Sequence, residues 1–186
     1  MEHFSYIAIA IVFLAILYAQ YVAVVKNANM VREALSGIDV QLKKRYDLIP
    51  NVLTIAKRFM EHESALFEKI VELRSQAINS NLGSKEKFET EALLDTQLKS
   101  LMVNVENYPQ LKSDETMLQA MRTYNEVEEN ISAARRFYNS ALTQLKNLIQ
   151  IFPSSLFASC AGDVVNYSYF ETDEASKAPI DANKYL

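Results

Sequence analysis

Glu128, Arg135 and Tyr138 are the side chains whose types and spacing most suggest a polar site. Glu128 and Arg135 are seven residues apart, so in a helix they lie two turns apart on one face, and Tyr138 continues that face. The face is otherwise apolar, and buried charges must be paired or hydrogen-bonded. Three interpretations stay open: a polar layer that fixes the register of packed helices, a ligand pocket inside the protein, or an exposed stripe.

Lys43, Lys44 and Arg45 form a run of cations that could attract acidic groups. If a straight helix leaves a membrane at Lys26, this run lies about 25–30 Å beyond the surface. That distance is several times the Debye length of about 8 Å at physiological salt. The run therefore favours a solvated tip or a docking patch for a protein partner over a site for lipid headgroups.

Asp47, Pro50 and Asn51 follow the basic run at the same tip. Asp47 can cap a new helix, and Pro50 fits a first turn, where no intrahelical donor is needed. We predict that the chain reverses near residues 46–47, with Asp47 and Asn51 fixing the reversal. The alternative is one long helix kinked at Pro50. A second interpretation of the same residues is a binding site for a small ligand or a protein partner.

His62 and Cys160 do not form a catalytic pattern. His62 stands between two glutamates, but the spacing supplies neither further metal ligands nor a nucleophile, and Cys160 has no cysteine or histidine partner nearby. The two histidines, His3 and His62, are too far apart for an HExxH motif, and a single cysteine excludes an intramolecular disulfide and a cysteine-rich metal site. We therefore expect no catalytic residue, no metal and no cofactor, and a protein that is not an enzyme.

The composition also excludes several fold classes. Only three glycines and four prolines occur in 186 residues, too few turn formers for an all-β protein, and no glycine-rich phosphate-binding motif is present. The net charge of −4 argues against a nucleic-acid partner, because such proteins usually carry a basic surface. Long helices in a single domain remain.

Residues 4–25 form an uncharged, mostly apolar stretch long enough to span a bilayer. Tyr6 lies near one end, and Tyr18 and Tyr21 lie near the other, as in the aromatic belts of membrane helices. A cleaved signal peptide is the alternative, but its apolar region would be shorter and would follow a lysine or arginine. We expect a retained anchor over residues 1–26, with the lipid bilayer as a partner.

The orientation of this anchor follows from its flanking cations. No lysine or arginine precedes residue 4, whereas Lys26, Arg32 and the run at residues 43–45 follow the span. The positive-inside rule then places the N-terminus outside and the rest of the chain in the cytoplasm. Ala15, Ala19 and Ala23 share one face of the span, and small residues at this spacing let membrane helices pack closely.

The apolar periodicity beyond the membrane predicts four helices in residues 27–160. The first continues the anchor and has a seam at spacings of three and four residues: Val24, Ala28, Val31, Leu35, Ile38 and Leu42. The second is expected over residues 48–79, the third from the Ser84 cap to Pro109, and the fourth from the Ser113 or Asp114 cap to Pro153. Gly37 lies inside the first helix, where it is either a point of close packing or a position at which the helix is less stable.

Several segments together resemble the LemA family of bacterial membrane proteins. They are residues 38–51, which include Asp47-Leu48-Ile49-Pro50-Asn51, then His62-Glu63, residues 108–112, residues 128–139, which include Ala134-Arg135-Arg136 and Tyr138-Asn139, Phe152-Pro153 and residues 169–171. The resemblance covers nearly the whole chain. It implies a single-pass membrane protein with a short outside N-terminus, an antiparallel four-helix bundle inside, and no established enzymatic activity.

We therefore expect an all-α protein: an N-terminal transmembrane helix continuing into an antiparallel up-and-down four-helix bundle, followed by an extended tail over residues 161–186. The tail is rich in aromatic residues, which is unusual for a disordered segment, so we expect it to pack on the bundle or on a neighbouring chain. The expected function is a scaffold or interaction module that forms homo-oligomers. The alternative is a membrane-anchored sensor that binds a ligand or a cytoplasmic partner at the tip between Asp47 and Pro50.

Overall fold

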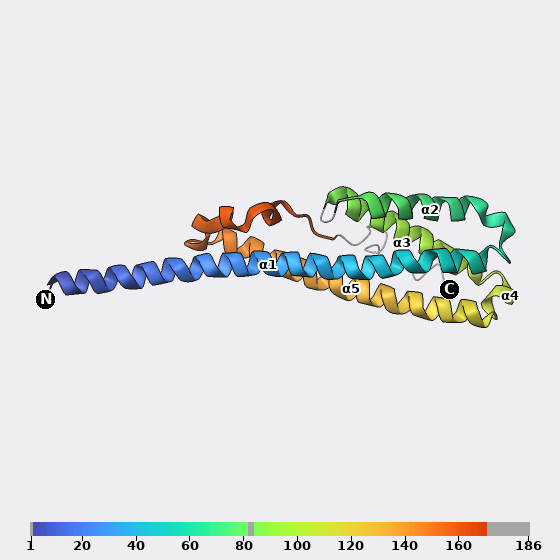
Figure 1. Ribbon diagram of the computed structural model, residues 1–186, viewed down its shortest axis with the longest axis horizontal. Coiled ribbons are helices and arrows are strands. Elements are labelled where there is room, and N and C mark those ends of the chain that lie inside the picture. The colour runs from blue at the N-terminus through green and yellow to red at the C-terminus, as the bar shows by residue number, and fades with distance from the viewer. Residues whose placement is uncertain (1, 82–83, 171–186) are drawn as a thin grey trace, which may run out of the picture.

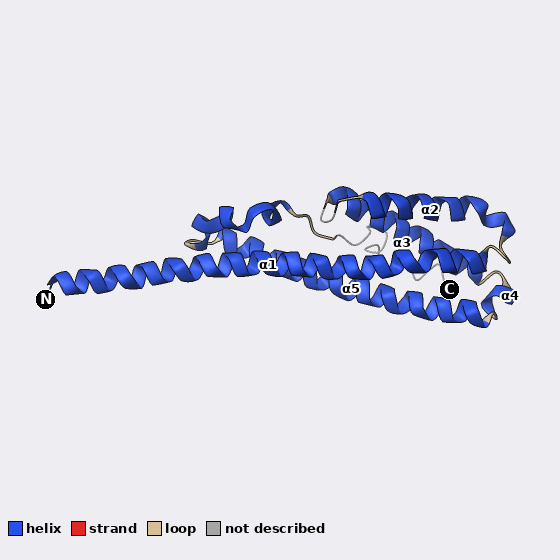
Figure 2. Ribbon diagram, viewed as in Figure 1, coloured by secondary structure: helices blue, strands red, loops and turns tan. Residues whose placement is uncertain are grey.

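The computed structural model describes residues 2–81 and 84–170, and none of these residues is in a β-strand (Figures 1 and 2). Five α-helices and two 3₁₀ segments make up the fold: α1 (Glu2–Ala56), η1 (Glu61–Glu63), α2 (Ser64–Asn79), α3 (Lys85–Val105), α4 (Pro109–Lys112), α5 (Glu115–Gln150) and η2 (Ser154–Asn166). The prediction of an all-α protein with a long apolar N-terminal helix is confirmed.

The four long helices alternate in direction along the bundle (Figure 1). α1 packs mainly against the antiparallel α5, and α2 packs against α3, while η2 folds back onto both α1 and α5. Side chains then connect the α1–α5 pair to the α2–α3 pair across the middle of the bundle. The result is the up-and-down arrangement expected when short loops connect successive amphipathic helices.

α1 differs from the expected first helix at its far end. The predicted reversal near residues 46–47 is wrong, because α1 runs without interruption through Asp47 and Pro50 to Ala56, and the chain turns between Lys57 and Glu63. The first third of the predicted second helix therefore belongs to α1. Proline is normally costly inside a helix, so the continuity requires a compensation, which the site described below provides.

The start of α1 extends beyond the bundle as an isolated helix (Figure 1). His3–Ala56 includes an apolar stretch long enough to cross a membrane, by length and composition. Most side chains of residues 3–22 are exposed, and the first fully buried one is Val24. From there the predicted seam is buried at every position, so α1 changes from an exposed apolar rod to the central helix of the bundle without a break.

The predicted caps of α3 and α5 are confirmed. The Ser84 side chain accepts a hydrogen bond from the Lys87 N–H, and the Asp114 side chain accepts one from the Met117 N–H. α3 ends at Val105, slightly earlier than expected, because Pro109 starts the short helix α4 rather than ending α3. Each cap satisfies one of the backbone donors that a helix start leaves free.

The segment after α5 is more ordered than expected. Instead of an extended tail from residue 161, η2 continues to Asn166, and Gly162 lies inside it with φ of 69°, which L side chains rarely adopt. The Arg32 guanidinium donates to the Ala161 carbonyl at 3.0 Å and to the Asp163 carboxylate at 3.1 Å. Residues 167–170 are extended, as predicted, and the expected tail over residues 171–186 lies outside the described residues.

Gly37 is not a packing point, because a side chain built there would meet no atom within 4 Å. Glycine inside a helix costs roughly 0.5–1 kcal/mol relative to alanine. We expect Gly37→Ala to raise the free energy of unfolding by about that amount, measured by chemical denaturation of the detergent-solubilised protein. If Gly37→Ala instead lowers the free energy of unfolding, a partner outside the bundle covers this side of α1.

Candidate functional site

Arg45 is the centre of the largest polar cluster among the described residues. The sequence suggested that it extends the exposed basic run, but its side chain is fully buried, and only Lys43 and Lys44 are exposed. The difference arises because successive helical residues point about 100° apart, so Arg45 falls on the face of Leu42 and Ile49. The expectation of one cationic patch at this place is therefore wrong.

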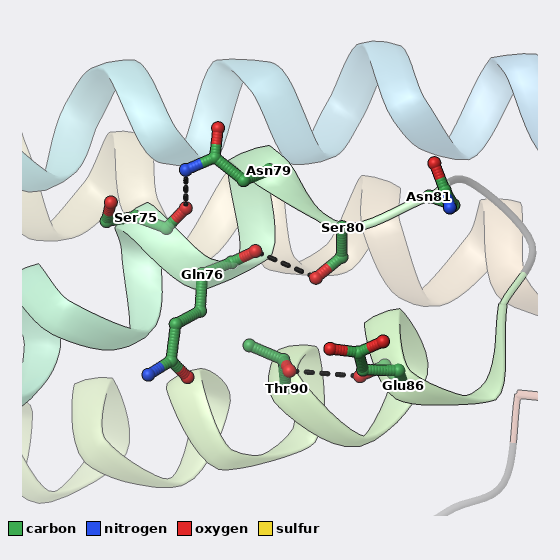
Figure 3. Close-up of a pocket in the computed structure, with 7 residues that line it drawn as sticks. All are labelled: Ser75, Gln76, Asn79, Ser80, Asn81, Glu86 and Thr90. Atoms are coloured by element: carbon green, nitrogen blue, oxygen red, sulfur yellow. Dashed lines mark hydrogen bonds between the residues drawn. The ribbon is translucent and has the colours of Figure 1, made fainter.

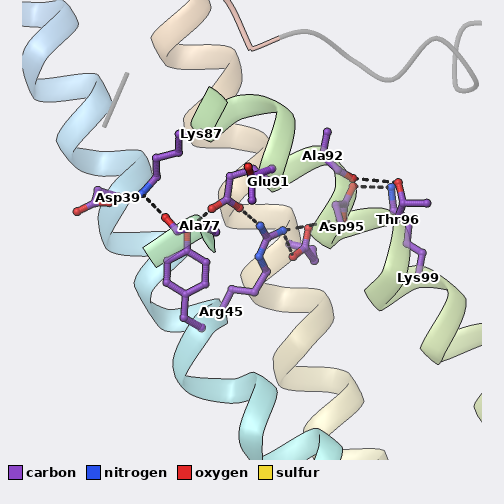
Figure 4. Close-up of polar contacts among 12 residues, drawn as sticks. Asp39, Arg45, Ala77, Lys87, Glu91, Ala92, Asp95, Thr96 and Lys99 are labelled. Carbon is purple, nitrogen blue, oxygen red and sulfur yellow. Dashed lines mark hydrogen bonds and ion pairs between the residues drawn. The ribbon is translucent and has the colours of Figure 1, made fainter. Parts of the chain in front are cut away.

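Three carboxylates from two other helices surround the Arg45 guanidinium. It pairs with the fully buried Glu91 of α3 and lies 4.0 Å from the carboxylate of Asp95 (Figure 4). The Glu128 carboxylate of α5 lies 3.0 Å from it. The Tyr46 hydroxyl donates to the second oxygen of Glu91. The cluster thus connects α1, α3 and α5, although α3 and α5 make little backbone contact.

Two lysines border this cluster on α3. The Lys87 ammonium group, almost fully buried, donates to the Ala77 carbonyl at 3.2 Å and lies 3.7 Å from the Asp39 carboxylate. It therefore ties the end of α2 to α1, as Figure 4 shows. Lys99, on the exposed side, pairs with Asp95 at 2.9 Å.

The electrostatics of the cluster keep Arg45 charged. Burial by itself lowers the pKa of the Arg45 guanidinium, but the charges of Glu91 and Glu128 reverse this effect and raise the pKa above its ordinary value. Arg135 differs, because burial, together with the nearby charge of Arg45, lowers its pKa. A guanidinium held in its charged form and enclosed by carboxylates cannot serve as an acid or base near neutral pH.

Several polar atoms around the cluster have no hydrogen-bond partner in the described part of the protein. They belong to Gln41, Arg45, Asp95, Tyr124 and Arg135. Buried polar atoms usually bind ordered water when no protein group is available. We interpret the cluster as a buried polar layer, which corresponds to the first of the three interpretations that the sequence left open for Glu128 and Arg135.

Tyr138 contributes to a second contact, next to this layer. Its hydroxyl donates to the Ser168 carbonyl at 2.8 Å, and the Lys146 ammonium donates to the Tyr167 carbonyl at 3.1 Å. The Asn139 amide donates to the Phe170 carbonyl at 2.9 Å and accepts the Phe170 N–H at 3.0 Å. α5 therefore holds residues 167–170 through side chains one or two turns apart.

Phe170 closes the end of the polar layer. Its ring stacks on Phe88 of α3 with 3.7 Å between centroids, and Tyr138 meets it edge-on. The Arg135 guanidinium carbon lies 5.2 Å from the centre of the Phe170 ring, a cation–π contact. The segment that resembles the family motif, residues 134–139, thus supplies one member of the polar layer and two residues that hold the tail.

Pro50 is tolerated in α1 because α2 replaces its missing donor. A proline has no N–H, so the carbonyl of Tyr46, four residues earlier, loses its intrahelical hydrogen bond. The Arg74 side chain donates to that carbonyl at 2.8 Å. Asp47, Pro50 and Asn51 are all exposed on the opposite side of α1, so they do not enter the polar layer.

The remaining predicted residues lie apart from the cluster. Ala15 and Ala19 are exposed on the protruding part of α1, and Ala23 is half-buried where the bundle begins. His62 is exposed in η1, and Cys160 is an exposed free thiol in η2. In the described ranges 2–81 and 84–170, no three histidine, cysteine or carboxylate side chains are grouped as metal ligands would be.

A surface hollow of about 350 Å³ lies between the end of α2 and the start of α3 (Figure 3). Three of the polar side chains that line it donate hydrogen bonds to backbone carbonyls four residues earlier in the chain. Asn79 donates to the Ser75 carbonyl, Ser80 to the Gln76 carbonyl and Thr90 to the Glu86 carbonyl. Asn79, Ser80 and Thr90 therefore use their side chains within their own helices rather than directing them at a ligand.

Glu91, Asp95 and Tyr46 are cluster members that the sequence analysis missed. A signal was present, because Glu91 fills the gap between Phe88 and Leu94 in the apolar seam of α3, as Arg45 does between Leu42 and Ile49 in α1. Two opposite charges that each interrupt a seam are candidates for a buried pair.

The ionisation of the buried tyrosines reports whether this cluster is closed to water. Burial, followed by the charge of Glu91, raises the pKa of Tyr46, and burial, followed by the charge of Glu128, raises that of Tyr124. Burial also raises the pKa of Tyr138. Because a raised folded-state pKa favours the protonated phenol, this stabilisation is complete below about pH 10 and is lost as the pH rises toward the folded-state values.

We therefore expect the free energy of unfolding to fall as the pH rises above about 10. In a phenolate absorbance titration, these three tyrosines should ionise only together with unfolding, after most of the ten tyrosines have titrated. Circular dichroism at the same pH values measures the unfolding. If all phenols titrate with the helices intact, the hydroxyls are accessible to water and the cluster is open.

Comparison with known proteins identifies a family and a relative. The model of the LemA family matches residues 34–182. Protein LemA of Metamycoplasma hominis is 24% identical to this chain over 188 aligned residues, which cover 99% of the chain and 85% of the relative.

Proposed function

The chain belongs to the LemA family, and from this premise we propose that it is a non-enzymatic scaffold or interaction module held at the bacterial inner membrane by α1. One observation carries the proposal: the apolar rod and the central bundle helix are the same continuous helix, α1 (Glu2–Ala56). A helix without a hinge fixes the bundle relative to the membrane. The polar cluster supports a structural role, because the Arg45 guanidinium is paired with the carboxylates of Glu91 and Glu128.

The proposed topology places the N-terminus outside and the bundle in the cytoplasm. Lys26 and Arg32 follow the apolar stretch closely, and no lysine or arginine precedes it. Reporter fusions to the C-terminus test this orientation. A cytoplasmic reporter signal supports the proposal, and a periplasmic one overturns the orientation while leaving the anchor in place.

We also propose that α1 pairs with α1 of a second copy inside the membrane. Ala15 and Ala19 are exposed on one face of the protruding helix, which leaves room for close helix approach. Replacing both by leucine should convert oligomers in nanodiscs to monomers, measured by mass photometry. Ala10→Leu, on the opposite face, is the matched control and should leave the oligomers intact. A wild-type protein that stays monomeric in both detergent and nanodiscs contradicts self-association.

The second candidate function is a sensor that binds a partner along the outer face of α1. Lys43, Lys44, Asp47, Pro50 and Asn51 are all exposed on that face, opposite the core. Reversing the charges of Lys43, Lys44 and Asp47 separates the two functions. Loss of a specific cytoplasmic partner in affinity purification favours the sensor, whereas unchanged partners and oligomers favour the scaffold.

A further inference from the structure

The turn between α5 and η2, together with the first residues of η2, leaves three large apolar side chains in solvent. Ile151 is 62% exposed, Phe152 76% and Leu156 63%, and we call these three residues the edge patch. Outside the protruding part of α1, other exposed large apolar residues, such as Val103 and Phe137, are scattered over the helices. Scattered apolar residues are ordinary, but a cluster at one end of a bundle requires a partner.

The turn that follows α5 lies at the end of the bundle from which the apolar rod extends (Figure 1). The Phe157 ring meets the Tyr21 ring edge-on at 6.0 Å between centroids, which fixes the level of this turn on α1. The antiparallel register set by Arg45 and Glu128 independently brings the end of α5 to about the level of residues 22–24. Leu17 and Gln20 are half-buried on the same face of α1 as Val24, so this face is partly covered for about two further turns toward the N-terminus.

The turn is also chemically suited to an apolar surrounding. The sequence from residue 147 to residue 162 carries no charged side chain, and Lys146 and Asp163 flank this uncharged run. The Ser154 hydroxyl hydrogen-bonds to the Leu148 and Ile151 carbonyls, and the Ser155 N–H donates to the Ile151 carbonyl. Backbone groups that are satisfied within the turn lower the cost of placing it in lipid.

We propose that the edge patch inserts into the lipid interface beside the transmembrane helix and gives the bundle a second membrane contact. Tyr21 and Lys26, on α1 at this level, are of the residue types found at the boundary between hydrocarbon and headgroups. Two contacts, one through α1 and one through the edge patch, also restrict tilting of the bundle. This inference rests on the membrane anchoring proposed above, and the patch binds bilayer lipid rather than a second copy of the chain.

Single tryptophans test the inference directly, because the natural chain has none. Phe152→Trp and Leu156→Trp place the reporter in the edge patch of the full-length protein. Tyr18→Trp reports on the anchor, and Val103→Trp, at the far end of α3, is the matched exposed control. Each variant is reconstituted into phosphatidylcholine–phosphatidylglycerol vesicles that carry a nitroxide quencher near the headgroup.

We expect lipid quenching at Phe152→Trp and Leu156→Trp to be at least about twofold stronger than at Val103→Trp, with blue-shifted emission. If Tyr18→Trp is quenched while the edge variants behave like Val103→Trp, the inference is overturned and the anchor stands. If the edge variants are blue-shifted but not quenched, a protein surface covers the patch, and the inference also fails. If Tyr18→Trp is not quenched, the anchoring itself is wrong.

Discussion

Replacing Arg45 by methionine is expected to lower the free energy of unfolding by about 3–5 kcal/mol. The variant removes the cation but leaves Glu91, whose side chain is fully buried, without its ion-pair partner. It also removes the 3.0 Å contact with Glu128, which connects α1 to α5. Chemical denaturation of the detergent-solubilised protein, followed by circular dichroism, measures the loss.

Two further variants make the Arg45 experiment decisive. Lys44→Met changes the neighbouring exposed cation and should alter the free energy of unfolding by less than about 0.5 kcal/mol. Arg45→Met combined with Glu91→Met removes both buried charges and should recover a large part of the stability, because apolar pairs can replace buried ion pairs. If Arg45→Met is as mild as Lys44→Met, the Arg45 side chain is not buried as described.

Phe170→Ala is expected to lower the free energy of unfolding by about 3 kcal/mol. The ring is 9% exposed, stacks on Phe88 and covers the Arg135 guanidinium, so its loss opens the end of the polar layer. We also expect faster proteolysis of the chain after Asn166, because the tail loses its apolar contact with the bundle. Denaturation curves and limited proteolysis measure the two effects.

Phe137→Ala is the matched control for the Phe170 variant. Phe137 is 54% exposed on α5, so its removal costs little apolar burial, and alanine favours the helix. Its denaturation midpoint should stay close to that of the wild type. Equal effects of the two variants would contradict the docking of residues 167–170 on α5.

The sequence predicted those features of the fold that depend on local patterns. The seam from Val24 to Leu42 and the caps at Ser84 and Asp114 are where the periodicity and capping rules place them. These features depend on residues within a few turns of one another, so one sequence carries enough information for them.

Features that depend on distant residues were not predictable in the same way. Pro50 favoured a turn, whereas α1 continues through it, and Arg74 on another helix satisfies the Tyr46 carbonyl that Pro50 leaves without a donor. Arg45 looked like part of an exposed basic run, and its buried partners come from α3 and α5. The interrupted seams hinted at such a pair, but only the packing of the helices shows which charges meet.

The central claim is that one unbroken helix passes from lipid into the core of the bundle. Nitroxide labels at successive α1 positions from residue 4 to residue 40, in a Cys160→Ser background reconstituted in nanodiscs, measure this directly through their accessibility to oxygen and to a water-soluble nickel reagent. We predict high oxygen accessibility at nearly all positions up to about Val22, followed by a helical alternation of buried and water-exposed positions from Val24 onward. Nickel accessibility throughout residues 4–22, or loss of the helical period between residues 22 and 28, would contradict the account.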